Sequence, residues 1–402
     1  MREARNRSLF ISIALAVATL FFVSCNSSED PVPQHTWLVS LEPAGSATSG
    51  QIIFGANLIG LNELADHVQY DAKIYRMVYR TSFNGRKVEA SGIVGIPVDF
   101  QGALPVISMQ HGTIIRKSDA PSRNVNDYLL FSAMATTGMI TLIPDFLGFG
   151  ESEDIFHPYY IEEWEARPVV DMIKAAVELM ADSAWTWNNK LFLTGYSEGG
   201  YVTMATHKFI QEHPEEGLTV TASAPAAGGY DLIHMKDYFF SLDTYHEPFY
   251  LAYVFQAYKN TFSWNKPLTA FFQEPYATLI PGLFNGTLGG SEINLQLTEV
   301  VSDYLNPAML ETFETNPEYS ELRKALMENS LTDWMPEAPM RMYHGTADIT
   351  VPYDNTIATY QQLKENGAGN NLELISLEGA MHATGLIPMM KDMVPWIMAM
   401  KD

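Results

Sequence analysis

This chain of 402 residues has a single cysteine, few basic residues and no apolar run as long as a typical membrane span. One cysteine excludes an internal disulfide, and nothing is spaced as a cysteine-based zinc site requires. The 24 Lys and Arg residues stand against 47 Asp and Glu residues, which gives a formal net charge of −23. Because phosphate backbones repel a chain this acidic, we expect no nucleic-acid partner. The composition, 47% apolar and 18% charged, is that of a globular protein.

The first 24 residues have the order of features that export signals share. A start containing three arginines precedes a mainly apolar run at 9–23, and Ser24 and Cys25 follow. A basic start, a short apolar core and a small residue before the break are typical of a signal peptide. The core falls short of the roughly 20 residues that span a bilayer. The alternative is an uncleaved membrane anchor in which Cys25 has no role.

The residues around the single cysteine also resemble a known modification site. Phe22-Val23-Ser24-Cys25 is similar to a bacterial lipobox, whose cysteine becomes the lipidated first residue of the mature protein. The resemblance implies that Cys25 anchors an exported outer-membrane lipoprotein, facing either the periplasm or the outside of the cell. Stable anchoring takes more than one acyl chain. Residues 25–50 are rich in Ser, Pro, Gly and Ala, so we expect a flexible tether there.

The pattern changes after the predicted tether. Two β-rich runs at 73–82 and 87–97 are joined by Asn84-Gly85, a strong hairpin signal because both residues tolerate positive φ. Short apolar strand patterns then alternate with amphipathic helical patterns as far as residue 224, and again from residue 339. This alternation is typical of a mostly parallel central sheet with helices on both faces, an α/β class of fold. We expect residues 51–230 and 336–402 to form its two parts.

The alternation is interrupted at 231–335, which we interpret as a helical cap inserted into the core. Fifteen aromatic residues fall within the 47 positions from Tyr238 to Phe284. We expect most of these rings to form the core of the insertion. The others are expected to line a pocket for an apolar group.

One short motif carries a candidate nucleophile. Gly195-Tyr196-Ser197-Glu198-Gly199 follows an apolar strand pattern and opens an amphipathic helix pattern. This strand, turn and helix context is what a nucleophile elbow requires. A turn that tight leaves no room for a Cβ at either glycine. We therefore predict Ser197 as the nucleophile, the alternative being a serine that merely caps a helix.

A serine hydroxyl needs a base, and the base needs a carboxylate that orients it. In hydrolases with a nucleophile elbow, the chain order is serine, acid, histidine. Asp348 follows a strand pattern, and His382 follows the last one and is the only histidine after Asp348. Because carboxyl ends of parallel strands meet at one edge, these two residues are the predicted acid and base.

Two backbone N–H groups are expected to stabilise the oxyanion of the tetrahedral intermediate. One is the N–H of Glu198, next to the nucleophile. The other is that of Thr113, in a loop where Gly112 permits close approach, and we interpret the neighbouring His111 as structural. The Glu198 side chain has three interpretations: it disfavours anionic substrates, it holds a cationic or hydroxylated group, or it is paired internally.

From about residue 70 to its end, the chain resembles the α/β-hydrolases, and within them the secretory lipase and esterase branch. The resemblance rests on Gln110-His-Gly-Thr113, Pro144-Asp-Phe-Leu-Gly-Phe-Gly150, His157-Pro-Tyr159, Gly195-Tyr-Ser-Glu-Gly-Gly200, Gly229-Tyr-Asp231 and His344-Gly-Thr-Ala-Asp348. Glu198 departs from the glutamine common in that branch. The resemblance implies an α/β-hydrolase fold and cleavage of a small-molecule or lipid ester through an acyl-serine. It also implies no metal or organic cofactor, and a structural role for the Asp145 loop.

Two other functions remain open on the sequence. A serine peptidase on the same fold uses the same three side chains, because ester and amide hydrolysis share them. A catalytically silent binding protein displayed at the membrane is the third alternative. Such a protein usually lacks one of the three residues, whereas Ser197, Asp348 and His382 are all present.

Overall fold

The computed structural model describes residues 35–402 apart from 182 and 184, and its compact unit spans Thr36–Asp402. The predicted signal peptide and Cys25 therefore lie outside the described residues. Among the helices of that part of the chain, none combines the length and the apolar character that crossing a membrane requires.

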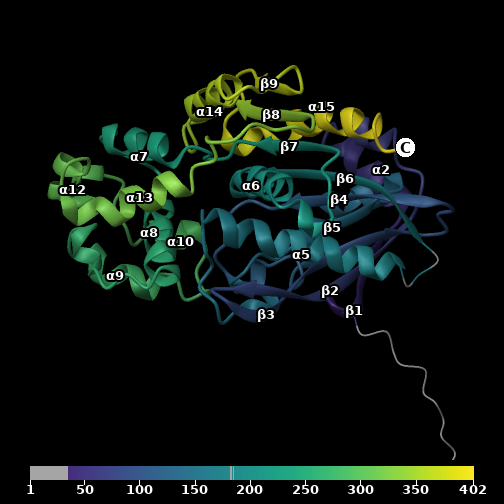
Figure 1. Ribbon diagram of the computed structural model, residues 1–402, viewed down its shortest axis with the longest axis horizontal. Coiled ribbons are helices and arrows are strands. Elements are labelled where there is room, and N and C mark those ends of the chain that lie inside the picture. Colours follow the sequence, from purple (N-terminus) through teal and green to yellow (C-terminus); the bar gives the residue numbers. More distant parts are fainter. Residues whose placement is uncertain (1–34, 182, 184) are drawn as a thin grey trace, which may run out of the picture. The chain divides into compact units, whose positions relative to one another are not determined.

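Nine strands in the described residues form one sheet, ordered β1-β2-β3-β5-β4-β6-β7-β8-β9 (Figure 1). Their bounds are β1 Leu38–Ala47, β2 Ala72–Phe83, β3 Arg86–Pro97, β4 Ala103–Gln110, β5 Ile140–Pro144, β6 Thr186–Tyr196, β7 Ala222–Ala226, β8 Met340–Gly345 and β9 Leu372–Leu377. The pairs β1–β2, β2–β3 and β3–β5 are antiparallel, and every pair from β5 across to β9 is parallel. The predicted mostly parallel sheet is confirmed.

The antiparallel edge contains the hairpin that Asn84-Gly85 predicts. Asn84 and Gly85 have φ values of 47° and 74°, the left-handed conformation that a tight two-residue turn needs. The ladder on either side is unbroken from Phe83 opposite Arg86 to Ala72 opposite Pro97.

Helices cover both faces of the sheet, as the alternation predicts. The helices that pack on one face are α5 (Glu162–Ala181), α6 (Glu198–Glu212) and α14 (Tyr353–Glu365). Those on the other are α2 (Ser49–Leu58), α3 (Asn62–Ala65), α4 (Leu129–Ser132) and α15 (Leu386–Met398). Short 3-10 turns join them, among them η3 (Ala133–Thr137) and η8 (His382–Thr384).

The insertion at 231–335 is helical. Its helices are α7 (Leu232–Ser241), α8 (Phe249–Thr261), α9 (Tyr276–Leu283), α10 (Gly290–Asn294), α11 (Val301–Tyr304), α12 (Pro307–Thr312) and α13 (Ser320–Glu328). Many of its aromatic side chains are fully buried, including Tyr258, Phe271 and Phe272. They belong to the same hydrophobic cluster as α5 and α6, so the core continues into the cap.

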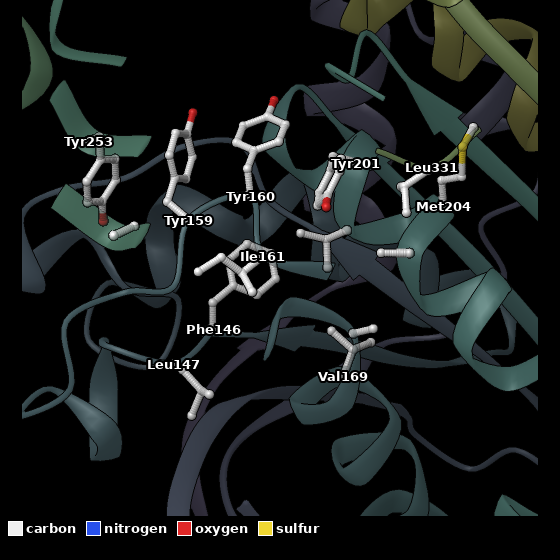
Figure 2. Packing of buried hydrophobic residues seen from close by; sticks show 14 of the residues in the cluster. Phe146, Leu147, Tyr159, Tyr160, Ile161, Val169, Tyr201, Met204, Tyr253 and Leu331 are labelled. Carbon is white, nitrogen blue, oxygen red and sulfur yellow. The ribbon is translucent and has the colours of Figure 1, made fainter. Parts of the chain in front are cut away.

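A row of tyrosines joins the cap to the sheet (Figure 2). Tyr253 of α8 stacks on Tyr159 with ring centroids 4.5 Å apart. Tyr159 meets Tyr160 edge to face at 4.7 Å, and Tyr160 lies 4.6 Å from Tyr201 of α6. Aromatic pairs in these geometries stabilise beyond the area they bury, so the row fixes the cap on the core.

The prediction of a flexible tether is wrong for residues 36–50, where β1 and the start of α2 are ordered. β1 pairs along β2 from Leu38 opposite Tyr79 to Ala47 opposite Ala72, although of its ten residues only Leu38 and Ala47 are buried. An edge strand of this kind is held by backbone hydrogen bonds, which side-chain composition does not reveal. Residues 25–34 lie outside the described part of the chain.

Candidate active site

Ser197 occupies the sharp turn between β6 and α6. Its φ of 62° and ψ of −126° fall outside the regions that L residues commonly adopt. A Cβ added at Gly195 would lie 2.2 Å from the carbonyl oxygen of Gly199, and one added at Gly199 would lie 2.0 Å from that of Gln110. No side chain fits at such distances. The two glycines therefore stand where the backbone leaves no room for any other residue.

Ser197, His382 and Asp348 lie in one line of hydrogen bonds. Ser197 Oγ is 2.8 Å from His382 Nε2, and His382 Nδ1 is 2.6 Å from Asp348 Oδ2. Because a carboxylate accepts, Nδ1 carries a proton and donates it. Nε2 is then free to accept the serine proton. The three residues follow β6, β8 and β9, which end at the same edge of the sheet.

The environment of Asp348 keeps its carboxylate charged although it is buried. Oδ1 accepts the N–H groups of Thr350 and Val351 at 3.0 and 3.1 Å. Oδ2 accepts from His344 Nε2 at 3.1 Å as well as from His382. Burial acts to raise the pKa of Asp348, but the hydrogen bonds from His344 and His382 outweigh it and lower the pKa to about 2.

Two tyrosines of the cap bind the loop that carries the acid. The Tyr238 hydroxyl donates to the carbonyl oxygen of Ile349 at 3.0 Å, and the Tyr245 hydroxyl donates to that of Thr350 at 3.1 Å. Both acceptors directly follow Asp348 in the chain. The cap and the acid loop are therefore linked by two hydrogen bonds.

The groups predicted to bind the oxyanion lie beside the nucleophile. Gly112 is next to the elbow, since a Cβ added there would meet Ser197 Cβ at 3.6 Å, an ordinary van der Waals contact. Within the described residues, no acceptor hydrogen-bonds to the backbone N–H of Thr113 or of Glu198. Thr113 Oγ1 is hydrogen-bonded to the Tyr159 hydroxyl at 2.9 Å, which fixes the loop. Two unpaired donors next to the serine match what an oxyanion hole requires.

The Glu198 side chain is paired internally, one of the three interpretations left open by the sequence. Its Oε1 lies 2.8 Å from His157 Nε2, and both side chains are buried. His157 Nδ1 donates to the carbonyl of Leu147 at 2.7 Å. Since Nδ1 already holds a proton, a second proton must lie between Nε2 and Glu198. Glu198 Oε2 has no partner in the described residues.

A second carboxylate completes this buried cluster. Glu165 Oε1 accepts the Tyr160 N–H at 2.7 Å and lies 3.8 Å from His157 Nε2. Burial and the nearby Glu198 charge raise the pKa of Glu165 well above its usual value, despite the opposing hydrogen bond from Tyr160. The ligand-type atoms of His157, Glu165 and Glu198 lie within 4.8 Å of one another. Both ring nitrogens of His157 are engaged, Nδ1 with the Leu147 carbonyl and Nε2 with Glu198, so we interpret the group as a hydrogen-bonded cluster.

An apolar cleft leads from the cap to Ser197. Five of the fifteen cap aromatics named from the sequence line it: Phe239, Phe240, Tyr245, Tyr250 and Phe255. The remaining ten are not among its lining residues, in keeping with the expected division between core and pocket. Tyr159 and Val351 close the side next to the sheet.

Two polar clusters of the site were not assigned from the sequence. His344 binds Asp348 from four residues away; the motif His344-Gly-Thr-Ala-Asp348 was noted in the sequence, but the histidine was given no role. His157 and Glu165 meet Glu198 only through the fold, because they lie 41 and 33 residues from it in the chain. The buried Asp145 accepts from Ser91 and Ser122 and does not line the cleft, which agrees with a structural role for its loop.

The chain was compared with protein families, with curated proteins and with solved structures. A model of the prolyl oligopeptidase family matches residues 127–216. No curated protein matches the chain. Among solved structures, a Legionella pneumophila protein described as a hydrolase is 28% identical, with a TM-score of 0.81 over 90% of this chain and 98% of its own.

Two enzymes share the fold at lower identity. The rice cell wall degrading esterase LipA from Xanthomonas oryzae is 23% identical, with a TM-score of 0.76 over 90% of this chain and 97% of that one. Candida antarctica lipase A is 17% identical, with a TM-score of 0.64 over 89% and 82%. The sheet order and these neighbours establish that the chain has the α/β-hydrolase fold.

Proposed function

We propose that this protein is an exported serine hydrolase that cleaves carboxylic esters through an acyl-serine intermediate. The single observation that carries the proposal is the hydrogen-bond line from Ser197 Oγ through His382 to Asp348 at the base of an apolar cleft. Esterases and a lipase among the structural neighbours support an ester over other acyl derivatives.

In the acylation step, Ser197 Oγ attacks the acyl carbon while His382 Nε2 accepts the hydroxyl proton. Asp348 stabilises the imidazolium that results, and the N–H groups of Thr113 and Glu198 hydrogen-bond to the oxyanion. His382 then gives the proton to the departing alcohol as the ester C–O bond breaks. In deacylation, water repeats the sequence, so the acid leaves and Ser197 regains its proton.

The cleft favours a substrate with an apolar portion. Its lining is mostly aromatic and aliphatic, and its charged member, Lys236, is already paired with Asp237 and Glu314. Desolvating a charged acyl group there would cost free energy that no unpaired charge of the lining offsets. We propose an uncharged ester with an apolar acyl or alcohol group, either a small molecule or a lipid.

We also propose that Cys25 carries the lipid that anchors the protein outside the cytoplasm, at the outer membrane. The proposal rests on the lipobox-like residues that end at Cys25. Radiolabelled palmitate should enter the wild-type chain and not a Cys25→Ala variant. A wild-type chain that takes up no label and stays in the soluble fraction would overturn it.

A fluorophosphonate probe tests the catalytic proposal directly. We expect the wild-type protein to be labelled and the Ser197→Ala variant to remain unlabelled. A properly folded wild-type protein that never reacts would instead support the silent binding protein. Thermal unfolding of both proteins serves as the control for folding.

A serine peptidase is the second candidate, because the matched prolyl oligopeptidase segment includes Ser197. That segment spans β5, α5, β6, the elbow and α6, and ends before Asp348 and His382. A panel of p-nitrophenyl esters compared with aminoacyl anilides separates the two activities. Faster turnover of the anilides would replace the esterase proposal with the peptidase.

A further inference from the structure

The helix α2 exposes the densest group of large apolar side chains in the described residues. Phe54 and Leu58 are 72% and 75% exposed, and Ile53 and Ile59 are also exposed. Elsewhere in the described chain, exposed apolar residues of this size lie singly along the sequence. Scattered exposed residues are normal, whereas a contiguous patch marks a surface that something covers.

The same helix carries no charge. No Asp, Glu, Lys or Arg occurs between Ser49 and Gly60, although 18% of the chain is charged. Its inner side is anchored to the protein, since Ala56 is buried and Ile52 packs against the core beneath α15. The helix is therefore fixed in place with an uncharged apolar face turned outward.

The apolar face lies close in sequence to the proposed lipid anchor. Ten residues lie between Cys25 and Thr36, and the eleven steps from one to the other reach about 36 Å at about 3.3 Å each. The ten residues of β1 that lead on to α2 span about 33 Å. An anchor at Cys25 is thus long enough to let α2 lie on the membrane that holds it.

We propose that the α2 face (Ile53, Phe54, Leu58 and Ile59) docks on the lipid bilayer, an inference that rests on the proposed anchor at Cys25. Uncharged apolar side chains of this kind insert at the boundary of headgroups and acyl chains. Figure 1 shows α2 far along the long axis from the cap helices α8, α9 and α12. Docking through α2 turns the cap and the cleft away from the bilayer, toward esters in the surrounding medium.

Site-directed labelling of the lipidated full-length chain tests the proposal. Asn57 is exposed within the patch and is not one of its apolar members, so Asn57→Cys carries a fluorescent label without removing any of them. Acylation blocks the thiol of Cys25, the only native cysteine, which leaves one reactive site. The protein is reconstituted into vesicles of phosphatidylethanolamine and phosphatidylglycerol.

We expect quenchers on the lipid chains to quench the label at position 57 and aqueous iodide to leave it bright. A label at Leu295→Cys, in the cap, should show the opposite pattern. Adding Phe54→Asp and Leu58→Asp to the Asn57→Cys protein should abolish the lipid quenching and leave hydrolysis of a soluble ester unchanged.

Four results would overturn the inference. Iodide could quench position 57 in vesicles, or the lipid quenching could survive both aspartates. The label could also be shielded without vesicles in a dimer, which assigns the patch to a second copy of the chain. A chain that takes up two labels lacks acylation at Cys25 and removes the anchor on which the inference rests. Fluorophosphonate labelling of Ser197 reports separately on the catalytic proposal.

Discussion

Two buried groups of acidic residues lie on either side of the nucleophile, and they differ in how many hydrogen bonds their carboxylates accept. Asp348 receives two backbone N–H groups and two imidazoles, and its pKa falls to about 2. Glu198 and Glu165 lie around a single histidine, each keeps one oxygen without a partner among the described residues, and the pKa of Glu165 rises. Asp348 and Glu165 are both buried, and burial acts to raise the pKa of each. The hydrogen bonds that outweigh burial at Asp348 are too few at Glu165, so the number of donors separates the two carboxylates.

The largest effect is expected from removing the charge of Asp348. In Asp348→Asn the residue no longer fixes the proton on His382 Nδ1, so Nε2 is not held ready to accept from Ser197. We expect kcat for ester hydrolysis to fall about 10⁴-fold. Steady-state kinetics measure this, with a stability measurement as control. A loss of less than tenfold would contradict the assigned role of Asp348.

Removing His157 should destabilise the buried cluster that it forms with Glu198 and Glu165. His157→Ala leaves a buried Glu198 carboxylate without its partner, which typically costs about 3–5 kcal/mol of unfolding free energy. Denaturant unfolding measures the change. His246→Ala is the matched control, because His246 is exposed and pairs with a single exposed glutamate, and it should change little. Equal stability of the two variants would show that the cluster does not depend on His157.

The contribution of His344 to the charge of Asp348 can be tested through the pH dependence of stability. The folded pKa of Asp348 lies below its usual 3.8, so its charge stabilises the protein above about pH 4, and that stability is lost as the pH falls toward 2. From the shift, we expect a loss of about 2 kcal/mol. His344→Ala removes one donor and should shrink this loss.

The measurement is the free energy of unfolding at several acidic pH values. Asp348→Asn serves as the control, since it lacks the titrating group altogether. If wild type and His344→Ala lose the same stability relative to that control, His344 does not help to hold the charge.

The smallest effect is expected from Glu198→Gln. The amide of the glutamine donates to His157 Nε2, so the link survives while the second proton of the cluster is no longer needed. We expect a change in stability within about 1 kcal/mol, against about 1–3 kcal/mol for Glu198→Ala, which leaves His157 unpaired. The two variants are compared by thermal unfolding and ester hydrolysis. A glutamine variant as damaged as the alanine variant would mean that the cluster requires a carboxylate.

The sequence predicts the central sheet and its hairpin because local patterns encode them. Apolar runs, helical periodicity and Asn84-Gly85 each act over a few neighbouring residues. The elbow is equally local, since Gly195 and Gly199 flank Ser197 within five positions. Such features need no knowledge of what lies across the sheet.

The features that the sequence did not predict depend on partners far away in the chain. β1 is ordered by backbone pairing to β2, so its Ser- and Gly-containing sequence suggested a tether. His157 and His344 stand in motifs noted from the sequence, but their partners Glu198 and Asp348 are set only by the fold. The internal pairing of Glu198 stood among the alternatives, but its partner is set by topology alone.

The hydroxyls of Tyr238, in α7, and of Tyr245, beyond its end, hold the two backbone carbonyls that follow Asp348. The cap therefore forms one wall of the cleft and also supports the loop that positions the acid. A substitution in the cap that removes these hydroxyls would act on the acid loop without touching Ser197, His382 or Asp348.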